Sequence, residues 1–294
     1  MTNAAPHAGT WRATLLVAIA ACAFGSITVL MVIGQRHGLT LASAMAWRYA
    51  LAAPFLALIA GSGLRAVTPS RGALLFVAGG LGQVAISGIS LYSLRWIDVA
   101  TLGFLFYTFP AWVAVISALR GLERVDRRKL TALALAFGGL AIIIGTPRTA
   151  AIPLAGLACA LGSAFIYAAY IPLLHWMRGP LSASAASALV IAGAGVMYFA
   201  AALWRGEIHA LPLAAWGVIA LLAFGSTVVA FITFLNGLAV LGPVRAAIIS
   251  TIEPFYTAIL GAIVLGQHVG PSTAVGGALI ASAVVLLQRQ PTSP

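Results

Sequence analysis

The sequence predicts an all-α membrane protein in which ten transmembrane helices form two inverted five-helix repeats around a central cavity. Three observations predict this fold class. Hydrophobic residues make up 62% of the 294 positions and charged residues only 7%, whereas a soluble domain has about 25% charged residues. Apolar runs of about 20 residues, the length that crosses a bilayer, follow one another along the chain. Short motifs of the first half recur in the second half.

The apolar runs lie between Gly, Pro and charged residues. Each is expected to be a helix, because a backbone in contact with lipid must satisfy its own hydrogen bonds. The connecting segments are short and leave no room for a soluble domain. The predicted spans cover residues 13–34, 39–61, 72–93, 100–119, 130–146, 152–177, 184–204, 213–238, 246–265 and 272–288.

A duplicated motif divides the chain into a first repeat, residues 1–148, and a second repeat, residues 149–294. Cys22-Ala23-Phe24-Gly25-Ser26 in the first span matches Cys159-Ala160-Leu161-Gly162-Ser163 in the sixth. A proline in the fourth span likewise has a counterpart in the ninth. Because each repeat holds an odd number of spans, the second must enter the membrane upside down. Inverted repeats are typical of secondary transporters.

The sixteen Lys and Arg residues are distributed unevenly over the predicted loops. The formal net charge of +11 does not indicate a nucleic-acid partner, because the arginines stand singly at the ends of apolar runs. With a cytoplasmic N-terminus, most basic residues fall inside, as the positive-inside rule requires. We therefore expect a multi-pass protein of the cell inner (plasma) membrane with both termini cytoplasmic. The inside residues are Arg12, Arg65, Arg71, Arg120, Arg124, Arg127, Arg128, Lys129, Arg178, Arg245 and Arg289, and the outside residues are Arg36, Arg95, Arg148 and Arg205.

Glu253 is the one carboxylate well inside a predicted span. Ser250, Tyr256 and Thr257 are three or four residues away and are expected to share its helical face, which predicts one polar wall of a cavity. A carboxylate at this depth is costly and usually faces a pathway. The alternative is a neutral glutamic acid that is hydrogen-bonded between helices.

Arg48 is the one cation within a predicted span, and Trp47 and Tyr49 flank it. Two interpretations remain open. In the first interpretation, Arg48 faces the cavity and meets a substrate carboxylate or Glu253. In the second, Arg48 lies near one membrane surface and extends its charge into the headgroups, with the flanking aromatic residues in the interfacial belt.

Pro110 and Pro254 are expected to break the fourth and ninth spans near the membrane midplane. A proline inside a helix removes a backbone donor and costs about 3 kcal/mol or more. Breaks of this kind form the binding sites of many transporters, and a purely structural kink is the alternative.

Further polar and aromatic residues are candidates for binding a small amphipathic solute. Cavities of this type combine aromatic walls with a few placed polar groups. Each residue taken alone is also compatible with simple packing. These candidates are Tyr92, Tyr107, Tyr167, Tyr170, Asn236 and Ser163.

The sequence argues against an enzyme and against a metal or cofactor site. All five histidines fall in loops or near span ends, so a metal set is not expected. No histidine or second carboxylate is available to pair with Ser163 or Glu253 for intramembrane chemistry. We expect no cofactor and no catalytic residues.

The second half carries a string of motifs that resembles a known repeat. Its segments are Leu222-Ala-Phe-Gly-Ser-Thr-Val-Val-Ala-Phe, Asn236-Gly-Leu-Ala, Gly242-Pro-Val-Arg-Ala-Ala, Glu253-Pro254-Phe and Leu265-Gly266. They resemble the EamA repeat of the drug/metabolite transporter superfamily, and the five-plus-five organisation does so over nearly the whole chain. The resemblance implies ten helices, a central cavity and alternating access.

The chain departs from this family pattern in two places. The first half has Phe109-Pro110 where the family often has Glu-Pro, so Glu253 has no symmetric carboxylate partner. Glu123 follows the Gly-Glu pattern after the fourth span loosely, whereas the second half has Gln267 there. The segment Phe165-Ile-Tyr-Ala-Ala-Tyr170 is similar to the sixth helix of the bacterial aromatic amino acid exporters.

These observations together predict a secondary transporter that exports small metabolites, with apolar or aromatic amino acids as the first hypothesis. A transporter of another small solute, such as a nucleobase, sugar or drug, is the alternative. The expected partners are a small-molecule substrate and the lipid bilayer, with no nucleic acid, and the protein is expected to be a monomer or weak dimer. The basic cluster at 120–129 either anchors the topology or binds anionic lipid.

Overall fold

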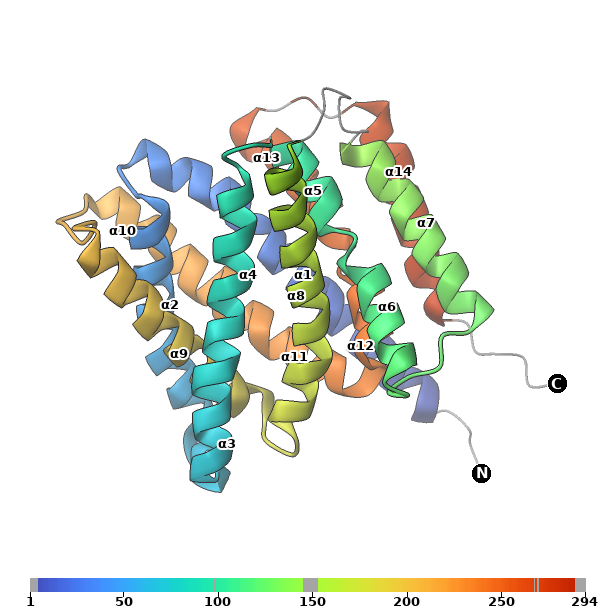
Figure 1. Ribbon diagram of the computed structural model, residues 1–294, viewed down its shortest axis with the longest axis horizontal. Helices are drawn as coiled ribbons and strands as arrows, with labels where there is room; N and C mark the ends of the chain where they lie inside the picture. Colours follow the sequence, from blue (N-terminus) through green and yellow to red (C-terminus); the bar gives the residue numbers. More distant parts are fainter. Residues whose placement is uncertain (1–4, 98, 145–152, 267, 269, 289–294) are drawn as a thin grey trace.

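The protein is an all-helical bundle (Figure 1), as a computed structural model shows for residues 5–97, 99–144, 153–266, 268 and 270–288. The prediction of an all-α chain is confirmed over these residues. The predicted repeat boundary at 148–149 lies outside them, as do Arg148, Gln267 and Arg289. The first-half helices are α1 (Ala5–Arg36), α2 (Leu41–Ala60), the 3-10 turn η1 (Gly61–Ala66), α3 (Pro69–Leu74), the π-helix η2 (Leu75–Gly79), α4 (Gly80–Ser93), α5 (Val99–Phe106), α6 (Phe109–Leu119) and α7 (Arg127–Ile144).

The second half repeats this order of elements. Its helices are α8 (Leu154–Arg178), α9 (Ala183–Trp204), α10 (Leu213–Ala220), the π-helix η3 (Leu221–Val229), α11 (Ala230–Leu241), α12 (Pro243–Ile249), α13 (Ile252–Leu265) and α14 (Pro271–Gln288). The corresponding helices α1 and α8 run in opposite directions, α1 from bottom to top and α8 from top to bottom in Figure 1. This is the arrangement that an inverted repeat requires.

Seven helical stretches among the described residues are long and apolar enough to cross a membrane. The other three predicted positions hold the helix pair α5–α6 and the helices α7 and α14. Large apolar side chains point outward at many places, including Trp204 at 90% exposure, Leu213 at 87% and Leu119 at 82%. Such a surface suits lipid better than water. The seven stretches are Gly9–Arg36, Leu41–Ala66, Pro69–Ser93, Leu154–Arg178, Ala183–Trp204, Leu213–Leu241 and Pro243–Leu265.

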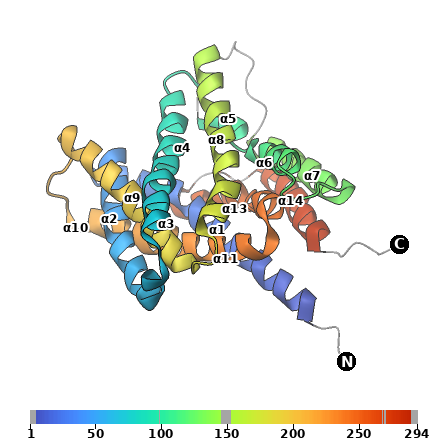
Figure 2. The same ribbon diagram turned by 60° about the horizontal axis from the view of Figure 1, so that its bottom comes forward.

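Two tight helix pairs flank the centre of the bundle. Helix α2 packs along α9 at one side and α7 packs along α14 at the other, with α1 and α11 between them (Figure 2). The backbones of α7 and α14 approach each other closely at glycines, since a Cβ added at Gly139 would collide with the carbonyl of Gly276. Small residues at an interface let two helices in a membrane approach closely, and glycine has this role in the α7–α14 pair.

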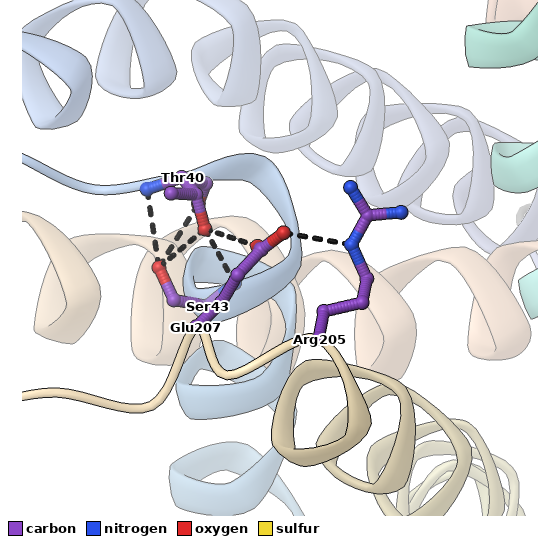
Figure 3. Close-up of polar contacts among 4 residues, drawn as sticks. All are labelled: Thr40, Ser43, Arg205 and Glu207. Atoms are coloured by element: carbon purple, nitrogen blue, oxygen red, sulfur yellow. Dashed lines mark hydrogen bonds and ion pairs between the residues drawn. The ribbon is translucent and has the colours of Figure 1, made fainter.

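A polar clamp joins the two halves where α2 begins and α9 ends (Figure 3). Glu207, in the segment between α9 and α10, accepts a hydrogen bond from the Thr40 hydroxyl at 2.6 Å and from Arg205 Nε at 2.7 Å. Thr40 is also the N-cap of α2 and forms a capping box with Ser43. The Thr40 hydroxyl, and next the Arg205 guanidinium, hold the pKa of Glu207 below its ordinary value.

Candidate functional site

The Glu253-Pro254 pair lies at the start of a helix. Helix α12 ends at Ile249 and α13 begins at Ile252, so Glu253 lies in the first turn of α13. Proline is tolerated in a first turn because its missing N–H would have no helical partner there. A carboxylate near a helix N-terminus is also stabilised by the helix dipole. The expected cost of a proline within a continuous span is therefore avoided.

The first half contains the equivalent interruption. Helix α5 ends at Phe106 and α6 begins at Phe109, with Pro110 in its first turn. In each half a threonine hydroxyl at the break donates to the carbonyl three residues before it, Thr108 to Leu105 and Thr251 to Ile248, both at 2.7 Å. Phe109 occupies the place that Glu253 has in the second half, so the two breaks are alike in backbone and unlike in charge.

A central cavity of about 460 Å³ lies between the two halves. It runs from Glu253 towards the ends of α1 and α4, where Gln35 and Leu94 line it. Its wall is mostly apolar, with a few hydroxyl, amide and charged groups. The lining residues are Phe24, Ile27, Thr28, Met31, Val32, Gln35, Leu41, Met45, Arg48, Tyr49, Gln83, Ile86, Ser87, Ser90, Leu91, Leu94, Leu102, Phe106, Tyr167, Tyr170, Ile171, Leu174, Phe231, Phe234 and Glu253.

Aromatic rings pack around the Glu253 end of this cavity. Phe106 is stacked on Tyr167 with 5.5 Å between ring centroids, and Phe109 lies 4.6 Å from Tyr167 behind them. On another wall, Phe24 meets Phe231 edge to face at 5.6 Å. Ring pairs of this kind give a stiff apolar surface, which suits the flat or branched side chain of a small solute.

Glu253 is held from two sides. Its side chain lies within hydrogen-bonding reach of the Tyr107 hydroxyl. Its backbone carbonyl accepts a hydrogen bond from the Thr257 hydroxyl at 2.9 Å, and the same hydroxyl is 2.9 Å from the carbonyl of Gly25 on α1. A Cβ added at Gly25 would lie 2.9 Å from the Glu253 carbonyl. The Gly25 motif thus brings α1 against the turn that carries Glu253.

Arg48 faces the interior of the bundle. The residue is 2% exposed and lines the central cavity. Its Nε donates to Thr227 Oγ1 at 2.5 Å, and its Nη2 donates to the carbonyl of Ser226 at 3.1 Å. Of the two interpretations of Arg48, the structure favours the inward-facing one, because a side chain this buried does not reach the headgroups.

The third span of each repeat contains a π-helix. A side chain from the opposite half forms a hydrogen bond with each of the two π-helices. Arg48 of the first half binds η3 of the second. Tyr170 of the second half donates from its hydroxyl to the carbonyl of Gly79 in η2 at 2.8 Å. Turns of π-helix are rare and often occur at functional sites. Both Arg48 and Tyr170 line the cavity, so the two bonds lie at its wall.

The structure brings four of the predicted substrate residues to the cavity wall: Arg48, Tyr167, Tyr170 and Glu253. Tyr107 lies behind Glu253, and Asn236 and Tyr256 are not among the lining residues. Ser250 is outside α13, so it does not share the helical face of Glu253 as expected. Tyr92 is 47% exposed and meets Trp96 edge to face near the end of α4. Ser163 and Ser250 donate to carbonyls of their own helices.

Sequence reasoning missed several residues of this wall. Met45, Phe231 and Phe234 line it, together with Gln35 near the end of α1. For Met45 a signal was present, because it lies three residues before Arg48 and therefore on the same helical face. The two phenylalanines carried no signal, since aromatic residues in a span face lipid or cavity equally well.

A second cavity, of about 820 Å³, lies at the opposite end of the bundle. Glu123, His175, Arg178 and Gly242 are among its lining residues. Helix α8 contributes residues to both cavities, with Ile171 and Leu174 at the central one and Pro172 and His175 at the second. Arg178 Nη1 donates to the carbonyl of Leu235 at 2.7 Å beside the second cavity.

Glu123 closes the same end of the bundle. Its carboxylate pairs with Lys129 at 2.6 Å and accepts the backbone N–H of Val244, in the first turn of α12, at 3.1 Å. A first-half carboxylate is thereby fixed to the start of a second-half helix.

Comparisons with known proteins agree with this architecture. The profile of the EamA-like transporter family matches residues 11–145 and again residues 154–289. An uncharacterized transporter of Bacillus subtilis (strain 168), YcbK, is 27% identical over 180 residues, which span 58% of this chain and 58% of the relative. A solved structure described only as the crystal structure of a protein superposes with a TM-score of 0.77 at 17% identity, covering 93% of this chain and 95% of that one. At this identity the likeness concerns the fold alone.

Proposed function

Because this chain belongs to the EamA-like transporter family through both of its halves, we propose that it exports amino acids, preferring apolar or aromatic ones, by alternating access. The family membership confirms that the chain is a multi-pass membrane transporter and not an enzyme. The substrate, the direction of transport and the orientation of the termini are the proposed parts. The alternative of a nucleobase, sugar or drug is an outcome of the test below.

The observation that carries the proposal is the central cavity with Glu253 among aromatic rings. A volume of about 460 Å³ falls within the range of small-molecule sites, about 300–1,000 Å³. The rings of Phe106, Tyr167 and Phe231 offer an apolar surface to the side chain of a solute. Its ammonium group can meet the Glu253 carboxylate or the face of Tyr167. An amino acid with an apolar side chain has both features.

The charge of the cavity argues against phosphorylated solutes. Arg48 is the one Lys or Arg residue among those that line it. Phosphate groups are usually bound by several cationic donors in fork-like geometry. A single guanidinium, balanced by one carboxylate on another wall, suits a solute with little or no net charge.

The two cavities support alternating access. The central cavity reaches the ends of α1 and α4, and the second cavity lies at the other end of α8 and α11. With cytoplasmic termini, as the distribution of basic residues favours, the central cavity faces outward and the Arg178 and Glu123 contacts close the inner side. Movement of one half against the other, with bending at the breaks beside Pro110 and Pro254, would exchange the two openings.

The proposal is tested by uptake of labelled amino acids into proteoliposomes, with and without an imposed pH gradient. We expect saturable uptake of apolar and aromatic amino acids. Glu253→Gln should alter this uptake or its response to the gradient, whereas the control Asp126→Asn, at a carboxylate outside both cavities that accepts a hydrogen bond from the start of α7, should not. Uptake that only equilibrates indicates a facilitator. Absence of uptake for every amino acid, in liposomes shown to contain folded protein, would refute the substrate class and direct the panel to nucleobases, sugars and drugs.

A further inference from the structure

We propose that Arg48 binds a carboxylate group of the transported solute and that the π-helix η3 of the opposite half holds Arg48 in position to do so. This inference rests on the proposed function, because it assigns a substrate class, solutes that carry a carboxylate, to the same cavity. It also gives a reason for the π-helix η3, to which Arg48 is hydrogen-bonded.

Among the described residues, no carboxylate is in contact with Arg48. Charged side chains at membrane depth are usually paired or face a pathway. Within the described residues the ion pairs are Lys129–Glu123 and Arg205–Glu207, and neither includes Arg48. The Arg48 charge is therefore balanced by no side chain in contact with it.

The remaining acidic residues do not supply this charge. Asp126 accepts the backbone N–H of Lys129 at the start of α7, and Asp98 lies outside the described residues. Glu253 lines the same cavity but belongs to no ion pair that the structure records. The recorded side-chain contact of Glu253 is with the Tyr107 hydroxyl. One unpaired charge of each sign thus borders the cavity.

The guanidinium group of Arg48 has hydrogen-bond donors to spare among the described residues. An arginine has five N–H groups in a planar fork. Those of Arg48 are recorded in three hydrogen bonds, all with neutral acceptors: Thr227 Oγ1, the Ser226 carbonyl and, at 3.6 Å, the sulfur of Met45. The guanidinium also lies over the neutral ring of Tyr49, 5.0 Å from its centroid. Two N–H groups have no acceptor among the described residues. A carboxylate in the cavity matches this fork in shape and in charge.

The π-helix η3 fixes the guanidinium of Arg48 before a solute arrives. The Thr227 hydroxyl donates to the carbonyl of Leu222, five residues earlier, at 2.8 Å. Since its one hydrogen is used in this bond, the Thr227 oxygen is oriented to accept from Arg48. The side chain of Ser226 is in turn 2.7 Å from that of Ser26 on α1. A receptor group that is already ordered loses less entropy on binding.

A purely structural role for Arg48 makes a different prediction. A hydroxyl, a carbonyl and a thioether accept hydrogen bonds from a neutral donor as well as from a cation. A strut between α2 and η3 therefore needs the length of the side chain but not its charge. The carboxylate proposal needs the charge. The two roles are separated by whether loss of the charge removes the preference for a carboxylate ligand while binding of the matched amide is retained.

The experiment measures binding of matched ligand pairs to the purified full-length protein in nanodiscs by calorimetry. The pairs are phenylalanine and phenylalaninamide, leucine and leucinamide, and 3-phenylpropanoate and 3-phenylpropanamide. We expect the wild type to prefer each carboxylate over its amide by about 10- to 100-fold, the range for one charge-assisted contact. Arg48→Gln should reduce this preference to about twofold or less, while amide binding is retained. Arg48→Lys should keep part of the preference, because it keeps the charge but not the fork.

Two variants in the continuous helical segment α10–η3–α11 test whether η3 positions Arg48. Thr227→Val removes the hydroxyl that orients Arg48 and should lower the carboxylate preference without removing any charge. Thr233→Val removes a hydroxyl that bonds only to its own helix and should leave the preference unchanged. These variants keep the test decisive if Arg48→Gln fails to fold.

The outcomes separate this inference from the proposed function. Wild-type protein that binds no carboxylate better than its amide overturns the role of Arg48, and so does a preference that survives Arg48→Gln. Binding of phenylalanine without dependence on Arg48 would leave amino acid transport standing and remove this inference. An Arg48-dependent preference for 3-phenylpropanoate, with no binding of amino acids, would support the inference and refute amino acids as the substrate.

Discussion

The substitution Gly25→Ala tests how α1 positions the turn that carries Glu253. The added Cβ would lie 2.8 Å from Thr257 Oγ1 and 2.9 Å from the Glu253 carbonyl, whereas ordinary contact begins at 3.4 Å. The two helices must therefore separate by about half an ångström, and overpacking of this kind costs about 1–3 kcal/mol. We expect the midpoint of thermal unfolding in detergent to fall by about 2–12 °C. Because the displaced backbone includes Glu253, substrate affinity should change in the same variant.

Gly162, the repeat counterpart of Gly25, provides the matched control. A Cβ added there meets no atom within 4 Å, and alanine is the better helix former. Gly162→Ala should therefore leave Tm unchanged or raise it, and substrate affinity should stay the same. Equal losses of Tm in the two variants would refute the reasoning, because they would show that the contact at α13 contributes nothing.

Three other substitutions test the contacts that hold the halves together. Gly139→Ala should lower Tm through the collision with α14, while Gly138→Ala, whose Cβ lies 3.9 Å from the nearest atom, should not. Glu123→Gln should lower the free energy of unfolding by about 1–3 kcal/mol, because it leaves the buried Lys129 charge unpaired. Adding Lys129→Met should restore part of that loss. If the effects of the two substitutions simply add, the pairing is contradicted. The Thr40 and Arg205 contacts lower the pKa of Glu207, so the carboxylate stabilises the fold above its ordinary pKa of 4.5 and loses this effect as pH falls through the lowered pKa. The stability advantage of wild type over Glu207→Gln, at most about 1 kcal/mol, should thus raise Tm at neutral pH and vanish in acid. A constant difference in Tm across pH would exclude the clamp.

The spans were predictable because lipid imposes one simple requirement on each of them. The predicted span 184–204 is helix α9, Ala183–Trp204, and the predicted span 39–61 is α2, Leu41–Ala60. Glycine, proline and charge mark these ends in the sequence. The fourth and ninth spans are interrupted at the expected prolines. In each of them one helix ends and a new helix begins, so neither span is a continuous helix with a kink.

The π-helices were not predictable from the sequence. Leu75–Gly79 and Leu221–Val229 have the same apolar composition as the α-helices that continue them. Their extra residue per turn is maintained by contacts from the opposite half, such as the Tyr170 bond to Gly79. No local pattern records a contact with a partner that is 91 residues away in sequence.

The candidate site was predictable in part for a related reason. Glu253 stood out because charge at membrane depth is rare. The orientation of Arg48 could not be derived, because its position near one end of the α2 span suits both an interfacial and a buried side chain. The inward orientation of Arg48 is set by η3, where Thr227 and Ser226 accept hydrogen bonds from the guanidinium.

The unequal pair of Phe109 and Glu253 sets an energy difference between the two end states of the molecule. In a chain with identical inverted halves, exchanging the conformations of the halves would convert one end state into the other without any change in free energy. Each state would then hold half of the molecules. Residues that differ between the halves break this degeneracy, and a tenfold ratio of populations needs only about 1.4 kcal/mol. That is the size of one hydrogen bond, so a single substitution at Phe109 or Glu253 is large enough to change which side of the membrane the resting protein faces.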